Sequence, residues 1–369
     1  MSATGRDQTP APEPSDLAAA LEDAAFVRLV SDATGEALAG TGLLARALAD
    51  DGTPFQASVV APFADPDRTT EADVTVALGA GDGADHTLSA RPAATAFAIA
   101  REFGAGPDPV LALAGTIAGS DVDGTVADAA ERAGVARRPG LAVPVADTAD
   151  GLAHSTLLSA PFSGDVEAAR AALADLDLPT DTTDDDHRRL ASLVALAVTE
   201  DAPDQATEVV AAGLHPYIGG PFETVGGYAD VLNAVAREAP GTGIALALGH
   251  DGIRESALSA WRTHANRAHT AVADATTGRY DGLFVARGDA MPVGTVARLV
   301  ADFHAPEPVT LVVTDGEAAA RATDGRDVAA TMRAATDDIG GETVGRGDSA
   351  RARFDVPTSE LIEAFRGTV

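Results

Sequence analysis

A strand–helix–strand pattern near the N-terminus constrains the fold more than any other feature of this chain. An apolar run at 26–30 leads into a Ser-Asp-Ala-Thr-Gly loop at 31–35, and an Ala- and Leu-rich segment follows over 36–51. A turn and a second apolar run occupy 52–60, and a third apolar run lies at 72–79. Strands joined by a helix pair in parallel, and parallel strands are buried on both faces. The chain therefore begins as an α/β domain built on a parallel sheet.

Length and composition predict a globular protein with two domains. The chain has 369 residues, of which 46% are hydrophobic, enough for two proper cores. It has no cysteine, which excludes disulfides, cysteine-ligated zinc and thiol nucleophiles. No apolar run reaches the roughly 18–20 residues that cross a bilayer, so no membrane association is expected.

The charge is strongly acidic. The formal net charge is −30, and all 26 basic residues are arginine. This acidic, lysine-free composition is typical of proteins from extreme halophiles. At molar salt the Debye length is about 3 Å, so repulsion from nucleic-acid phosphates is largely screened, and electrostatic attraction is screened equally. Binding to a nucleic acid would therefore depend on shape, stacking and hydrogen bonds.

The N-terminal segment and a Gly/Pro-rich loop suggest the domain limits. Residues 1–15 are polar, Pro-rich and acidic, without the basic start and apolar core of a signal peptide. We expect a disordered tail there and a cytoplasmic protein. The loop at 213–221 suggests a first domain with a helical insertion over 16–213 and a second domain over 214–369.

The remaining elements follow from periodicity and from capping residues. Strands are predicted at 282–286 and 309–313, and the alternation at 350–356 predicts an edge strand. The apolar segment 243–249 fits a strand or a buried helix turn. Predicted helices span 92–103, 107–119, 122–133, 163–176, 183–199, 203–212, 224–238, 254–275, 292–302, 327–338 and 358–366.

The opening βαβ unit resembles that of the DHH phosphoesterases, a family that includes the RecJ-type single-strand exonucleases. In that family the first strand ends in a His-x-Asp-x-Asp-Gly loop whose carboxylates hold divalent metal. Here Ser31 lies near the first Asp position, Asp32 is retained, and Thr34 stands where the next Asp belongs. The scaffold is kept, whereas the metal chemistry of the loop is reduced.

The other metal motifs of the family also depart from its pattern. The candidate for the Asp-His-His motif is Asp85-His86-Thr87, in which Thr replaces the second His. Gly79 occupies the end of the third strand, where the family carries an Asp, and Asp82 follows three residues later. The later Gly-x-x-x-Asp helix end corresponds to 115–121, with Asp121 displaced by a residue or two.

Two Mn²⁺ or Mg²⁺ ions need about four to six oxygen or imidazole donors. Asp32, Asp82, Asp85, His86 and Asp121 are the candidates for such a site. The alternative is that these are solvent-facing loop side chains, since 56 acidic residues guarantee chance matches. We predict that the catalytic set is a remnant and that no metal or other cofactor is bound, with Mn or Mg required only if the protein is active.

The second half resembles the archaeal RecJ-like branch of the family. The segment 226–237 is similar to its Ala-x-x-Leu-Asn-Ala-x-x-Arg helix, which lines the interdomain groove and here carries Asn233 and Arg237. The C-terminal segment resembles the DHHA1 nucleic-acid-binding domain, whose Gly-Gly-Gly-His-x-x-Ala-Gly motif lets a phosphate approach the backbone. The residues that correspond to this motif are Gly340, Gly341, Arg346 at the His position and Arg351 at the last Gly.

The predicted fold class is therefore α/β, with an N-terminal parallel-sheet DHH-like domain and a smaller C-terminal α/β DHHA1-like domain. The resemblance implies a catalytically degenerate protein that binds single-stranded DNA or RNA, or a replication or repair scaffold. The scaffold role is inferred by analogy with the DHH-like scaffold subunit of the replicative helicase. The same analogy suggests a GINS-type complex as the partner. The alternatives are an active metal-dependent single-strand exonuclease and a hydrolase of small phosphoesters. The residues predicted to bind nucleic acid are Asn233, Arg237, Gly340, Gly341, Arg346 and Arg351.

Overall fold

The computed structural model describes residues 13–65, 71–79, 83–174, 176, 183–200, 202–250 and 252–368. Helix α1 (Pro14–Glu22) begins inside the tail predicted over 1–15, so that tail is too long by two residues, and residues 1–12 lie outside the described part. In the described part of the chain, no helix combines the length and the apolar character needed to span a membrane.

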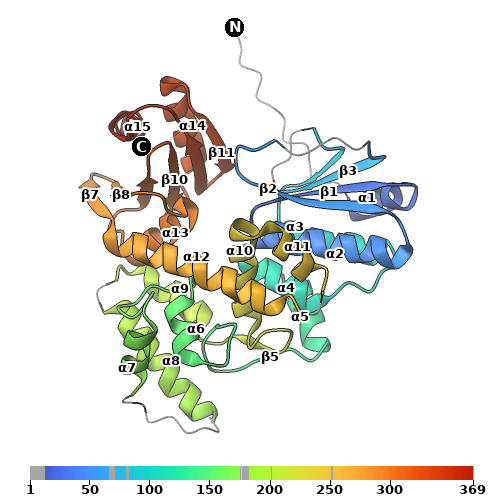
Figure 1. Ribbon diagram of the computed structural model, residues 1–369, viewed down its shortest axis with the longest axis horizontal. Helices are drawn as coiled ribbons and strands as arrows, with labels where there is room; N and C mark the ends of the chain where they lie inside the picture. The colour runs from blue at the N-terminus through green and yellow to red at the C-terminus, as the bar shows by residue number, and fades with distance from the viewer. Residues whose placement is uncertain are drawn as a thin grey trace.

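The N-terminal layer is the predicted parallel sheet. Its four strands lie in the order β2-β1-β3-β4, and all neighbours are parallel. Helices pack against this sheet (Figure 1). The strands are β1 (Val27–Asp32), β2 (Phe55–Val60), β3 (Val74–Leu78) and β4 (His86–Leu88), and the helices that follow α1 are α2 (Gly35–Asp51), α3 (Pro92–Glu102), α4 (Pro109–Ala118) and α5 (Gly124–Arg132).

Local chemistry fixes the first helix of the βαβ unit. Thr34 caps α2 by accepting a hydrogen bond from the Ala37 backbone N–H at 3.3 Å, and Gly52 ends the helix with a left-handed φ of 86°. The small and aliphatic side chains of α2 are almost all buried. The side chain of Thr34 thus stabilises the helix start.

Three further helices connect this layer to the rest of the chain. They are α10 (Val225–Glu238), α11 (Pro240–Ala247) and the long α12 (Arg254–Asp274). The strand considered for 243–249 is wrong: Pro240 opens a helix there, and Gly243 packs against Leu38 of α2. Because α10 and α11 share one hydrophobic core with α2 and α4, a domain boundary after α11 is favoured over 213/214; the position of the boundary stays a prediction.

The predicted helical insertion lies between the two sheets in sequence. It comprises α6 (Thr148–His154), α7 (Val166–Ala174), α8 (Asp184–Thr199) and α9 (Gln205–Gly213), followed by strand β6 (Tyr217–Ile218), which pairs with β5 (Ala136–Arg137). Its apolar side chains form a second core with α12 and with α13 (Val293–Phe303) of the C-terminal domain.

The C-terminal domain is a six-stranded mixed sheet in the order β11-β12-β10-β9-β8-β7. The edge strand predicted at 350–356 is wrong in position, because β12 lies between β10 and β11 and is paired on both sides. The strands are β7 (Thr276–Tyr280), β8 (Leu283–Arg287), β9 (Val309–Val313), β10 (Glu317–Ala322), β11 (Glu342–Arg346) and β12 (Ser349–Arg353), and the helices are α13 (Val293–Phe303), α14 (Val328–Ile339) and α15 (Thr358–Arg366).

The two sheets stand side by side, and α12 runs beneath them from the C-terminal sheet toward α11 (Figure 1). The predicted α/β class, with a parallel-sheet domain followed by a C-terminal α/β domain, is confirmed.

Candidate functional site

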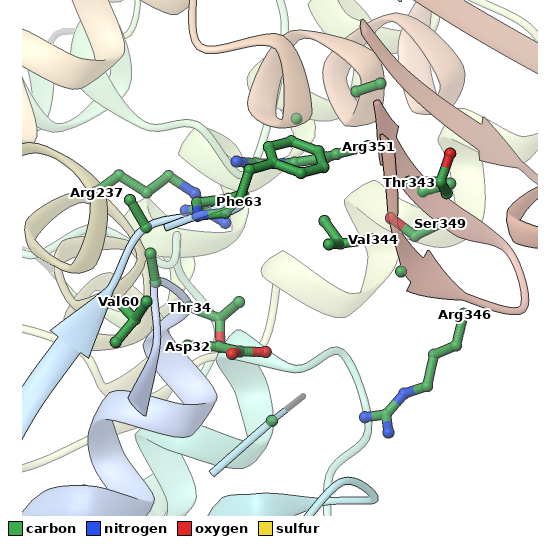
Figure 2. A pocket seen from close by; sticks show the side chains of 18 of the residues that line it. Asp32, Thr34, Val60, Phe63, Arg237, Thr343, Val344, Arg346, Ser349 and Arg351 are labelled. Atoms are coloured by element: carbon green, nitrogen blue, oxygen red, sulfur yellow. The ribbon is translucent and has the colours of Figure 1, made fainter. Parts of the chain in front are cut away.

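A cleft of about 1310 Å³ separates the two sheets. One wall is formed by the carboxyl ends of β1, β2 and β3, and the other by β10, β12, the β11–β12 hairpin and α14. Helices α10 and α13 contribute the side chains between the walls. Figure 2 shows side chains from both walls converging on this space. The cleft includes the carboxyl edge of a parallel sheet, which is where open α/β folds bind ligands.

Only part of the metal loop of the DHH phosphoesterases has a counterpart at this edge. Asp32 ends β1 and lines the cleft, whereas the Thr34 hydroxyl is engaged in capping α2. Gly79 follows β3, and a Cβ added there would collide with the Asp32 carboxylate. The Asp32 side chain therefore fills the space that a second carboxylate at position 79 would need.

The structure does not bring the other predicted ligands to Asp32. His86 of β4 pairs with Val76 of β3. Ser31 of β1, the residue just before Asp32, pairs with Leu78 of β3. By strand geometry His86 lies about 10 Å back along the strands and about 10 Å across them from Asp32. Asp85 accepts a hydrogen bond from the Thr75 backbone N–H at 2.8 Å, near the start of β3 and away from its carboxyl end.

Asp121 is also engaged elsewhere. Its carboxylate pairs with Arg91 Nε at 2.9 Å and is largely exposed. Asp82 lies outside the described residues. Within the described ranges, no group of three or more His, Asp or Glu side chains is close enough to hold a metal ion. The described donor set, Asp32 and Glu36 beside Thr34 and Gly79, does not fit a pair of Mn²⁺ or Mg²⁺ ions.

Glu36 is a cleft residue that the sequence analysis missed. It lies in the first turn of α2, and its carboxylate packs so closely on Gly119 that a Cβ there would collide with it. Burial raises its pKa to about 7; Arg346 opposes this shift, and nearby Asp121 adds to it. The raised pKa depends on the α2–α4 contact, which no local pattern reveals.

The remaining charged side chains of the cleft are mostly basic. The basic ones are Arg237, Arg298, Arg321, Arg333, Arg346 and Arg351, and the acidic ones are Asp65, Asp337 and Glu342. In the part of the chain that the structure describes, Arg237, Arg333, Arg346 and Arg351 form no ion pair within 4.0 Å. In a chain of net charge −30, such a concentration of unpaired cations points to an anionic ligand.

Arg237 is the most constrained of these cations. Its Nη1 donates to the Asn233 carbonyl at 2.7 Å, and its Nε is buried without a hydrogen-bond partner. Burial, together with the like charges of Arg351 and Arg298, lowers the pKa of Arg237 to about 9. An anion placed between these guanidiniums would relieve both the repulsion and the unmet donor.

Arg298 and Arg351 are positioned by contacts outside the N-terminal sheet, with Thr156 and with the start of α13. Arg298 Nη2 donates to the Thr156 carbonyl at 2.7 Å, and the Arg351 guanidinium lies directly against Gly294 at the start of α13. A side chain at position 294 would collide with Arg351, so glycine makes room for it. Figure 2 shows Arg237 and Arg351 reaching toward the same space, and Arg346 extending from the hairpin.

The other residues predicted to bind nucleic acid have different positions. Asn233 lines the cleft, but its side chain accepts from the Gly35 N–H at 2.9 Å and donates to the Ala118 carbonyl at 3.3 Å, which joins α10 to α2 and α4. Gly341 lines the cleft, whereas Gly340 ends α14 with a φ of 77° and is not among the lining residues. Gly340 thus serves as a helix cap.

Phe63, Arg298, Arg321 and Arg333 also line the cleft, and the sequence predictions did not include them. A signal existed for Arg321, which is the one basic residue in the alanine-rich strand β10. Phe63 follows β2 and has a φ of 64°, a conformation unusual for an aromatic residue, but no sequence pattern indicates it.

Comparisons with known proteins agree with this architecture. The chain is 70% identical over 372 residues to the uncharacterized protein rrnAC1427 of Haloarcula marismortui, with both proteins covered completely. Residues 275–367 match the family model described as the C-terminal domain of that protein.

Among solved structures, CDC45 from Entamoeba histolytica matches with a TM-score of 0.58 and 9% identity, covering 96% of this chain and 97% of that one. The exonuclease RecJ bound to manganese matches with a TM-score of 0.49 and 14% identity, covering 99% and 95%. The likeness to CDC45 shows the fold. The chain belongs to the family of protein rrnAC1427, and its fold is similar to that of CDC45.

Proposed function

We propose that this protein binds single-stranded nucleic acid in the cleft between its two sheets and does not cut it. The observation that carries the proposal is the set of arginines without ion pairs in the cleft, above all Arg237 and Arg351. They face the edge of the parallel sheet, where the carboxylates typical of the DHH phosphoesterases are missing. Guanidinium groups suit phosphate oxygens, and within the described residues Arg237, Arg333, Arg346 and Arg351 form no ion pair within 4.0 Å.

Cleavage is the part of the family chemistry that the described residues do not support. The donors beside Asp32 do not form a cage for two divalent ions, and the nearest added carboxylate, Glu36, is held toward its neutral form by burial. The metal-assisted activation of water therefore has no counterpart among the described residues.

A binding assay tests the proposal directly. A labelled oligo(dT) in molar KCl should bind with the same affinity in Mn²⁺ and in EDTA and should remain intact after long incubation. Degradation of the oligonucleotide in Mn²⁺ would establish the alternative, an active metal-dependent exonuclease. Absence of binding under both conditions would remove the proposal.

The substitution Arg237→Met is expected to weaken oligo(dT) binding about ten-fold, which corresponds to about 1.4 kcal/mol. The apolar stem of Arg237 is preserved, while the cation that faces Arg351 and Arg298 is lost. The slope of the logarithm of affinity against the logarithm of salt concentration should also become shallower by about one, because one phosphate contact is lost. Fluorescence anisotropy measures both quantities.

Arg101→Met is the matched control, because Arg101 is an exposed residue of α3 outside the cleft lining. It should leave both the affinity and the salt slope unchanged. Equal loss in the two variants would mean that the overall charge of the protein, and not the cleft, determines binding.

A role as a replication or repair scaffold is the second candidate. The match to CDC45 over nearly the whole chain favours it, and a GINS-type complex is the partner suggested by that analogy. Pull-down from a native lysate in molar salt tests it; recovery of replisome subunits would support the scaffold role, and a partner set without them would count against it.

A further inference from the structure

We infer that the ring of Phe63 stacks on a base of the nucleic acid, so that the cleft recognises a base-bearing strand and not a phosphate chain alone. The inference rests on the proposed function and names the ligand group that the arginines do not explain. Phe63 lies just after β2 and lines the cleft, and its ring is half-buried. Figure 2 shows the ring projecting into the space that Arg237 and Arg351 face.

The backbone of Phe63 is strained in order to hold this position. Its φ of 64° lies in the left-handed region, which aromatic side chains rarely adopt. A residue in such a conformation persists only where the surrounding structure imposes it, and such residues are concentrated at ligand-binding sites. Phe63 is one of three non-glycine residues with positive φ in the described chain, the others being Arg91 and Ser120, and the only aromatic one.

The second wall of the cleft holds the ring in place. The Arg353 guanidinium of β12 lies 5.4 Å from the centroid of the ring, and its Nη2 is fixed by Glu342 Oε2 at 2.8 Å. Arg351 is two residues earlier on the same strand and therefore on the same face of it. A base on Phe63 and a phosphate at Arg351 would thus be neighbours, as they are within one nucleotide.

Stacking also suits the salt conditions that the composition predicts. At molar salt the attraction between arginine and phosphate is screened to about 3 Å, whereas contact between two π-faces is not. Base–aromatic stacking tolerates any base, because every base has a π-face. A strand bound with little sequence preference is therefore the ligand class that this ring and these cations fit together.

The experiment compares oligo(dT) with an abasic oligonucleotide of the same length and phosphate number, both at 2 M KCl, on the full chain. The wild type should prefer oligo(dT). Phe63→Leu, which keeps an apolar side chain and the same backbone strain, should lose about ten-fold in affinity for oligo(dT) and nothing for the abasic strand. Phe63→Tyr should keep the preference.

A stability measurement separates stacking from a structural role. Glycine adopts positive φ without strain, so Phe63→Gly should unfold at the same or a higher temperature while losing the preference for bases. If the ring instead serves packing, Phe63→Gly would unfold at a lower temperature, and the inference would be overturned.

The outcomes also separate this inference from the proposed function. If the wild type binds the two oligonucleotides equally, or if Phe63→Leu weakens both equally, the inference is wrong while the binding function stands. If the wild type binds neither, the proposed function fails and the inference with it.

Discussion

Replacing Asp230 with alanine is expected to lower the free energy of unfolding by about 3–5 kcal/mol, because it removes the acceptor at the centre of a buried network. Asp230 is 1% exposed, and its carboxylate accepts from the Thr156 backbone N–H at 3.0 Å and from Trp261 Nε1 at 2.8 Å. The Thr156 hydroxyl donates to it as well. The substitution leaves these donors buried and unpaired and opens a cavity.

The network joins three parts of the chain. Asp230 belongs to α10, Trp261 to α12, and Thr156 to the segment after α6, where its carbonyl also holds Arg298 of α13. Breaking it should therefore loosen the junction between the two sheets as well as lower stability. A weaker affinity of the cleft for oligo(dT) is expected together with the loss of stability.

Chemical denaturation in molar KCl, followed by fluorescence, measures this effect. Trp261 is the only tryptophan, so its emission reports directly on the group that loses its partner. Asp289→Ala removes the same charge from an exposed position and should change the free energy of unfolding by less than about 0.5 kcal/mol. A loss below about 1 kcal/mol for Asp230→Ala would show that the network contributes little.

The sequence predicted the first half of the fold because local and global signals agree there. The helix over 36–51 has its cap at Thr34 and its terminal glycine at position 52, and the strands on either side are rich in apolar residues. The segment 243–249 lacked this agreement, since an apolar run without alternation fits both a helix and a strand. Pro240, at the first turn of α11, was the signal that decides it.

The C-terminal sheet was harder to predict because its strands depend on their neighbours. Strand β10 (Glu317–Ala322) consists largely of alanine, which favours helix, and it becomes a strand through pairing with β9 and β12. The Ala–Arg alternation of β12 indicated a strand with one polar face but not its place inside the sheet. Order within a sheet is set by long-range pairing and has no local signature.

Some features of the candidate site could be predicted from the sequence, and others depend on contacts between distant residues. The missing carboxylates at Thr34 and Gly79 were visible in the sequence, and so were Arg237 and Arg351 as cleft cations. The sequence did not show that Asp32 fills the space beside Gly79, because that contact joins neighbouring strands. Glu36 and Phe63 were missed because their properties come from burial and from backbone conformation.

Glu36 lowers the free energy of unfolding as the pH rises, whereas a salt-bridged acid raises it. Its pKa in the folded protein is about 7, raised from 4.5 mainly by burial, while Arg346 and Arg91 oppose the shift and Asp121 adds to it. A hydrogen bond from the Ala93 backbone also opposes the shift. Between these pKa values the folded state binds the proton more tightly than the unfolded state, so this group lowers stability as the pH rises from 4.5 through 7.

Glu36→Gln should remove this dependence, since glutamine is neutral at every pH. After allowance for screening by the solvent in the cleft, we expect the variant to be more stable than the wild type by about 1–3 kcal/mol at pH 8 and equally stable near pH 4.5. Denaturant titrations at several pH values measure the difference, with Glu131→Gln on the exposed face of α5 as the control. An unchanged difference between variant and wild type across this range would mean that Glu36 is ionised at no cost, and that the cleft edge is better solvated than its packing on Gly119 implies.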